Sequence, residues 1–100
     1  MSDPAGPKLY LDGFLLVPPD RLAAVMAALP AHIALTRAEP GCLAFSVEPD
    51  ATVPGRFIVA EIFTDQPSFD AHQRRVAQSD WGRVTQGLVR DYSIRRGDPL

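Results

Sequence analysis

The stretch from residue 36 to residue 63, TRAEPGCLAFSVEPDATVPGRFIVAEIF, constrains the fold of this chain more than any other. It starts with the end of a helical pattern, which runs into Pro40 and Gly41. Proline lacks the amide hydrogen that a helix needs and disfavours helical geometry at Glu39, whereas glycine adopts backbone angles closed to other residues. The helix is therefore predicted to end here, and two apolar runs joined by a turn rich in proline and glycine are predicted to form a β-hairpin.

The two predicted strands, 42–47 and 56–63, differ in how their side chains alternate. In the first strand, Leu43, Phe45 and Val47 share one face, and smaller side chains occupy the other face. In the second strand both faces are largely apolar, which predicts that both are covered, and Glu61 is the exception. Because an unpaired carboxylate is costly to bury, Glu61 is the first candidate functional residue.

The size and composition predict a single soluble domain in the cytoplasm. The chain has 100 residues, is 46% hydrophobic and has no apolar run long enough to cross a membrane. A net charge of -2 and scattered basic residues argue against nucleic acid as a partner. The single cysteine, Cys42, has no partner for an internal disulfide, and the N-terminus lacks the pattern of a secretory signal.

The first half of the chain predicts a strand over 8–17 and then a long helix. Pro18 and Asp20 suit a helix start, since proline is tolerated in a first turn and an acidic residue is favoured there. Apolar residues then recur at helical spacing, but Pro30 is predicted to kink or split the helix near Leu29. The next polar residue beyond that break, His32, is predicted to be a partly exposed helix residue.

A second helix is predicted to begin at residues 64–67, where a side-chain cap precedes a proline. Phe69, His72 and Val76 follow at positions i, i+3 and i+7, so His72 shares the buried stripe of this helix.

A further helical segment is predicted to be capped by Ser79, and it carries Trp81 on its apolar stripe. Residues 89–95 alternate again as a last strand, with Tyr92 on its apolar side.

The order of elements is therefore β, α, β, β, α, β. This order predicts an α+β domain of the ferredoxin-like type, a four-stranded antiparallel sheet with both helices on one face. The opposite apolar face needs a cover, which predicts a homodimer. The predicted boundaries are a flexible leader at 1–7, the domain at 8–96 and a tail at 97–100.

The segments TRAEPGCLAFSV, RFIVAEIF and FDAH resemble the antibiotic biosynthesis monooxygenase superfamily, over nearly the whole chain. The resemblance implies a dimer in which two sheets form a shared α/β barrel, with a cavity between the sheet and helices of each subunit. It implies activities that include cofactor-independent oxidation of quinols and phenols, haem degradation, and isomerisation of small metabolites. His72 precedes Trp81 here, and Asp12 stands where the haem-degrading branch has an asparagine; both departures argue against haem.

The chemistry of such an oxygenase needs a base that titrates near neutrality, and His72 fits this need. The alternative is that His72 is a core histidine hydrogen-bonded to a neighbour such as Glu61. Glu61 in turn either orients His72 or binds substrate hydroxyls, or else pairs with Arg37 or Arg56. His72 and Glu61 are the candidate catalytic residues.

The candidate substrate-binding residues are Asp12, Phe14, Trp81 and Tyr92. Asp12 would anchor a polar group, with a carboxylate turned to solvent as the alternative. The three aromatic side chains would line a pocket for a flat ring, or else belong to the core.

The sequence has no phosphate-binding glycine loop, paired cysteines or metal-binding histidine spacing, so no cofactor is predicted. We therefore expect a cofactor-free monooxygenase that takes a small quinol-like or phenolic substrate and molecular oxygen. The alternatives are an isomerase acting on a small carbonyl compound and a non-catalytic binding or dimerisation module.

Overall fold

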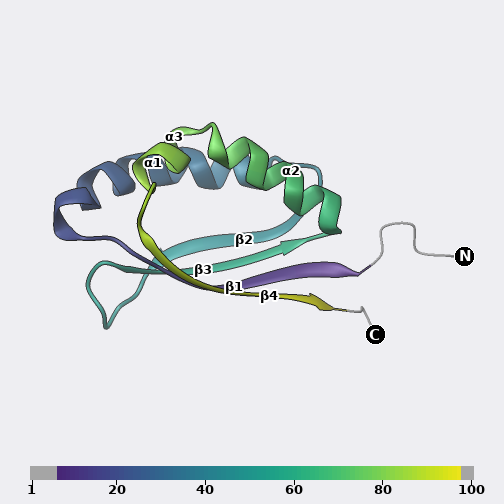
Figure 1. Ribbon diagram of the computed structural model, residues 1–100, viewed down its shortest axis with the longest axis horizontal. Coiled ribbons are helices and arrows are strands. Elements are labelled where there is room, and N and C mark those ends of the chain that lie inside the picture. Colours follow the sequence, from purple (N-terminus) through teal and green to yellow (C-terminus); the bar gives the residue numbers. More distant parts are fainter. Residues whose placement is uncertain (1–6, 98–100) are drawn as a thin grey trace, which may run out of the picture.

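The computed structural model describes residues 7–97, which form a layer of helices over one face of a β-sheet (Figure 1). Apart from residues 7 and 97, the predicted leader and tail lie outside the described residues. The elements are, in chain order, β1 (Lys8–Leu16), α1 (Pro19–Arg37), β2 (Cys42–Pro49), β3 (Arg56–Phe63), α2 (Gln66–Ala77), α3 (Asp80–Val84) and β4 (Val89–Gly97).

Between residues 7 and 97, the strands form one four-stranded antiparallel sheet with the order β2-β3-β1-β4. In the central pair, Leu11 of β1 lies opposite Glu61 of β3, and on its other side Leu11 lies opposite Ile94 of β4. All the helices lie on the same side of this sheet (Figure 1). The ferredoxin-like α+β arrangement predicted from the order of elements is confirmed.

The core lies between the sheet and the helices. Alternation along β1 and β3 places Leu9, Leu15 and Phe57 on the helix-covered face, where each is at most 2% exposed. The opposite face carries exposed apolar side chains, among them Ile58 and Val89 at 43% and 61% exposure. Within one chain, therefore, β3 is covered on one side and not on both.

The predicted split of the first helix near Leu29 and the predicted alternation at Leu43 are wrong. The helix α1 continues from Pro19 to Arg37 without a split at Pro30. Proline removes one helical hydrogen bond, and the buried side chains of Leu29 and His32 on either side of it hold the helix against the core. Leu43 is 49% exposed because the pairing of β2 shifts register between Cys42 and Ala44, which ends the strict alternation there.

The predicted helix caps are confirmed by hydrogen bonds. The Asp65 carboxylate accepts from the backbone N–H of Ser68 at 2.8 Å, and the Ser79 hydroxyl accepts from the backbone N–H of Gly82 at 3.1 Å. The first cap starts α2 where β3 ends, so His72 is carried on a helix whose start is fixed to the sheet. None of the helices between residues 7 and 97 is long and apolar enough to span a membrane.

Candidate functional site

A cavity of about 350 Å³, the inner cavity, lies between the sheet and the helices. It brings together four of the side chains predicted from the sequence to form the site: His72, Glu61, Trp81 and Tyr92. Its complete lining is His32, Glu61, His72, Gln73, Val76, Ala77, Trp81, Gly82, Arg90 and Tyr92.

Asp12 and Phe14 do not lie in the inner cavity. They lie on the face of β1 that points away from the helices. Asp12 is exposed there, with Ala60 of β3 and Ser93 of β4 as its neighbours on the adjacent strands. Asp12 lines another cavity of about 360 Å³, whose lining also includes Glu61. Their substrate-binding roles stay predictions, and the structure separates both residues from His72 by the thickness of the sheet.

His72 is 3% exposed on α2, and its Nδ1 atom lies 2.9 Å from Oε1 of Glu39. In the neutral ring, an Nδ1–H that donates to this carboxylate leaves Nε2 without a proton and therefore able to accept one. Burial lowers the pKa of His72, and the nearby Glu39 carboxylate opposes this effect. The neutral ring is thus the main form near neutral pH.

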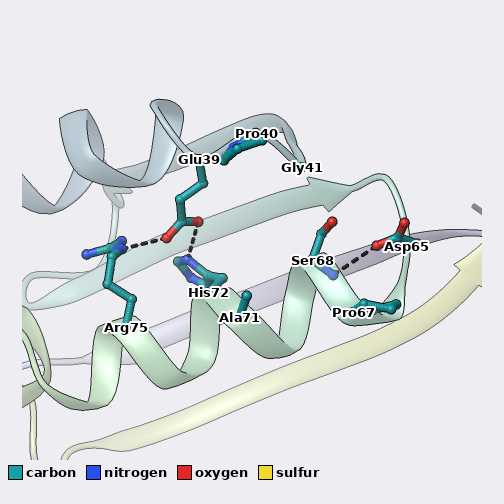
Figure 2. A pocket seen from close by; sticks show the side chains of 9 residues that line it. All are labelled: Glu39, Pro40, Gly41, Asp65, Pro67, Ser68, Ala71, His72 and Arg75. Atoms are coloured by element: carbon teal, nitrogen blue, oxygen red, sulfur yellow. Dashed lines mark hydrogen bonds and ion pairs between the residues drawn. The ribbon is translucent and has the colours of Figure 1, made fainter.

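Glu39 is a site residue that the sequence reasoning missed. It follows the C-terminus of α1, and one of its carboxylate oxygens is bonded to Arg75 while the other faces His72 (Figure 2). Arg75 also donates from Nη2 to the Thr36 hydroxyl at 3.0 Å. Glu39 was visible as the acidic residue before the helix-ending Pro40, inside the first of the segments that carry the family resemblance.

A second hollow of about 460 Å³, the outer cavity, lies on the Glu39 side of His72 (Figure 2). It is lined by residues of the α1–β2 connection, by the N-cap of α2 and by residues along α2: Glu39, Pro40, Gly41, Asp65, Pro67, Ser68, Ala71, His72 and Arg75. Because His72 lines both hollows, its ring forms part of the wall between them.

Glu61 is 8% exposed, and its Oε1 atom lies 4.0 Å from Nε2 of His72. This distance exceeds that of a hydrogen bond, and Oε1 has no hydrogen-bond partner among residues 7–97. Burial, with a smaller contribution from the charge of Glu39, raises the pKa of Glu61 to about 7. A carboxyl group with this pKa changes charge at neutral pH.

The two arginines that the sequence suggested as ion-pair partners of Glu61 interact with other groups. Arg56 pairs with Asp50 at 2.6 Å, and Arg37 donates to the backbone carbonyl of Phe45 at 2.9 Å. Both suggested ion pairs of Glu61 are therefore wrong.

His32 is buried, which corrects the prediction of a partly exposed residue. Its ring stacks on the Trp81 indole with centroids 4.6 Å apart and planes 5° from parallel. Because α1 is continuous past Pro30, His32 falls seven residues after Val25 and shares the core-facing stripe. Burial is the main cause that lowers the pKa of His32 to about 3, and the positive charges of protonated His72 and of Arg75 lower it further. The His32 ring therefore stays neutral.

The rim of the inner cavity is polar. Gln73 and Arg90 are exposed there, and Tyr92 is half-buried between the rim and the floor. Burial raises the pKa of Tyr92, so its phenol stays protonated near neutral pH. Among the described residues, no group of three histidine, cysteine, aspartate or glutamate side chains is arranged to hold a metal ion.

The fold and the site define a class, the small ferredoxin-like α+β domain with a cavity between sheet and helices. The sequence model for antibiotic biosynthesis monooxygenases matches residues 9–83. This chain therefore belongs to the antibiotic biosynthesis monooxygenase family, as the resemblance implied. Members of this family are typically dimeric. Among curated proteins, none matches the chain.

Solved structures with low sequence identity share the fold. A Bacteroides thetaiotaomicron protein of unknown function, described as a possible oxidoreductase, has a TM-score of 0.79 at 19% identity and covers 93% of this chain and 100% of its own. A candidate antibiotic biosynthesis monooxygenase from Nitrosomonas europaea has a TM-score of 0.76 at 20% identity, over 93% and 99% of the two chains. A Pseudomonas aeruginosa protein has a TM-score of 0.72 at 24% identity, over 98% and 99%.

Proposed function

We propose that this chain is a cofactor-independent monooxygenase that oxidises a small quinol-like or phenolic compound with molecular oxygen in the inner cavity. One observation carries the proposal. Nε2 of His72 and Oε1 of Glu61 lie 4.0 Å apart in the lining of this cavity, too far apart to form a hydrogen bond with each other. A substrate hydroxyl placed beside this pair would meet a base and an acid together. The family membership and the aromatic lining support the same reaction class.

The first step is proton transfer from the substrate hydroxyl to Nε2 of His72. The Glu39 carboxylate fixes the ring with Nδ1–H and stabilises the imidazolium that forms, as the acidic member of a catalytic triad does. Glu61, when protonated, donates a hydrogen bond to the same substrate oxygen and stabilises the anion. A buried carboxylic acid with a raised pKa is suited to this task.

The second step is oxidation by O₂, for which the substrate supplies the electrons. The substrate anion gives one electron to O₂, and the two radicals combine to form a C–O bond at a ring carbon. The protonated His72 returns its proton to the peroxide. The O–O bond then breaks, so that one oxygen stays on the ring as a carbonyl and the other leaves as water with the ring hydrogen. A hydroquinone and O₂ thus give a hydroxyquinone and water.

The surroundings of the pair suit this chemistry. Trp81 at 8% exposure and His32 at 5% form a flat stacked wall that keeps water from one side of the radical pair. A cavity of about 350 Å³ is roughly twice the size of an apolar cavity that binds benzene, so it fits one or two fused rings.

The proposal includes a homodimer and a cytoplasmic location. Two observations support the homodimer: apolar residues are exposed on the helix-free face of the sheet, and members of the family are typically dimeric.

Oxygen uptake with a panel of hydroquinones and hydroxynaphthalenes tests the proposal. We expect uptake above the autoxidation rate for wild type and a loss of roughly 100-fold or more in His72→Ala, because the base is removed. Arg74→Ala, an exposed position on the same helix, is the matched control and should retain wild-type uptake. No uptake by wild type, or equal uptake by a folded His72→Ala protein, would refute the proposal.

A second candidate is an isomerase that moves a proton within a small carbonyl compound. The arrangement that favours it is the same acid and base facing one point, since isomerisation needs both. Turnover without oxygen would select this candidate, and strict dependence on oxygen would exclude it.

A further inference from the structure

Arg90 is a cation at the rim of the inner cavity that the proposed reaction does not use. It is exposed, whereas the side chains at the floor, His72 and Glu61, are buried. The cavity therefore runs from a positively charged rim to the proposed reacting pair.

The guanidinium of Arg90 is fixed in place by the turn that follows α3. Its Nη2 donates to the carbonyl of Thr85 at 3.1 Å and to the hydroxyl of the same residue at 2.8 Å, and its Nη1 donates to the carbonyl of Leu88 at 3.2 Å. Thr85 is fully buried and donates in turn to the carbonyl of Trp81 at 2.6 Å. Arg90 is thus connected by hydrogen bonds to the aromatic wall of the cavity.

These bonds leave part of the Arg90 guanidinium available. A guanidinium carries five N–H donors, and the three bonds to Thr85 and Leu88 engage three of them. The Tyr92 phenol, in the lining of the same cavity, is a further hydrogen-bonding neighbour of the guanidinium. All three acceptors are neutral, and no carboxylate within residues 7–97 lies within ion-pair distance of Arg90. A charge held in one position without a counter-ion is prepared to bind an anion, because little side-chain entropy is lost on binding.

We infer that the ligand of the inner cavity carries an anionic group, a carboxylate, which Arg90 binds at the rim while an aromatic hydroxyl reaches His72. The inference concerns the ligand of the proposed oxygenase, on whose cavity it rests, but it makes a claim about binding rather than turnover. It narrows the substrate class from phenols in general to phenolic or quinol-like carboxylic acids.

A simpler account of Arg90 is that it only satisfies carbonyl groups at the end of α3. Arg21 provides the control for this account, because it donates to the carbonyls of Val84 and Gln86 in the same turn, at 2.6 and 3.3 Å. Arg21 does not line the inner cavity. A purely structural role would make the two arginines equivalent in their effect on binding.

The test is isothermal titration calorimetry with a hydroxynaphthoate and the matching hydroxynaphthamide, which differ in charge but little in shape. Wild type should bind the carboxylate about tenfold tighter than the amide, as one charge-assisted hydrogen-bonded pair allows. Arg90→Gln should reduce this preference to less than about twofold, Arg90→Lys should retain part of it, and Arg21→Gln should leave it unchanged. Added salt should weaken binding of the carboxylate and not of the amide.

Equal affinity of wild type for both compounds, or binding of neither, would overturn the inference. So would loss of the preference in Arg21→Gln to the same extent as in Arg90→Gln. Thermal unfolding of each variant confirms that the comparison is made on folded protein. An absence of oxygen uptake with any phenol would refute the proposed oxygenase and leave a measured carboxylate preference standing, so the two claims fail separately.

Discussion

The side chains of His72 and Glu39, which lie 33 positions apart in the sequence, are joined by a hydrogen bond of 2.9 Å between Nδ1 and Oε1. The bond links the second helix to the segment that ends the first, and it sets which nitrogen of His72 faces the inner cavity.

Replacing the Glu39 carboxylate should affect both the rate and its pH dependence. We expect Glu39→Gln to lower kcat roughly 10- to 100-fold, as loss of a residue that orients a functional histidine does. Glu39 raises the pKa of His72, so its loss should move the acidic limb of the pH–rate profile to lower pH. Glu48→Gln, at an exposed position on β2, is the control. An acidic limb that stays in place would show that Glu39 does not act through His72.

The rate should fall as Glu61 loses its proton. Its pKa is raised to about 7, so the hydrogen-bond donor required by the mechanism disappears as the pH rises through this value. In Glu61→Gln the amide donates at every pH, and the alkaline limb near pH 7 should disappear from the profile of kcat/KM. An alkaline limb that is unchanged in Glu61→Gln would assign it to another group.

Glu61 should also make stability fall with rising pH. Between its ordinary value of 4.5 and about 7, the unfolded chain is ionised at this position while the folded chain keeps the proton, so the unfolded state gains relative stability. Glu61→Gln should therefore gain in free energy of unfolding over wild type across this window, by on the order of 3 kcal/mol at its upper end. Urea unfolding at about pH 5 and about pH 8 measures the difference. A difference that does not depend on pH would contradict the raised pKa.

His32 should have the opposite effect in acid. Its pKa is lowered from 6.5 to about 3, so the unfolded chain binds a proton below pH 6.5 that the folded chain does not bind. Stability is therefore lost as the pH falls through this window. His32→Phe, which keeps a flat ring against Trp81, should unfold at lower pH than wild type in an acid titration followed by circular dichroism. Equal acid midpoints would show that His32 is not buried in its neutral form.

The helix-free face of the sheet should hold a second copy of the chain. Ile58 is 43% exposed at this face, and a charge introduced there would be buried without a partner in a dimer. Sedimentation velocity should give a dimer for wild type and a monomer for Ile58→Asp. The control, Leu35→Asp, changes a residue that is 52% exposed on α1 and should remain dimeric. A wild-type monomer at micromolar concentration would remove the homodimer from the account.

Local signals in the sequence predicted the elements, and four of the six candidate residues line one cavity. Asp65 and Ser79 cap helices as expected because a capping side chain acts on an amide only three residues away. The helical spacing around His72 was enough to place it inside the fold. Strand alternation and helix spacing placed His72, Glu61 and Trp81 on covered faces, and the family resemblance implied the cavity that they line.

The parts that could not be predicted depend on contacts between distant segments. Glu39 meets His72 and Arg75 only after α1 and α2 pack on the same sheet face, and nothing local to Glu39 indicates this. Alternation places Asp12 on the face of β1 opposite its buried leucines, but it does not show that the cavity beside His72 lies on the other side of the sheet. His32 was judged by the local effect of Pro30, and the packing of the whole helix overrode it.

The most direct test of the central claim is a crystal structure of the protein with a hydroxynaphthalene bound in the absence of oxygen. We expect an aromatic ring in the inner cavity against Trp81, with its hydroxyl at about 2.6–3.2 Å from Nε2 of His72 and within reach of Glu61. A ligand seated in the outer cavity or on the helix-free face, or a hydroxyl turned away from His72, would contradict it.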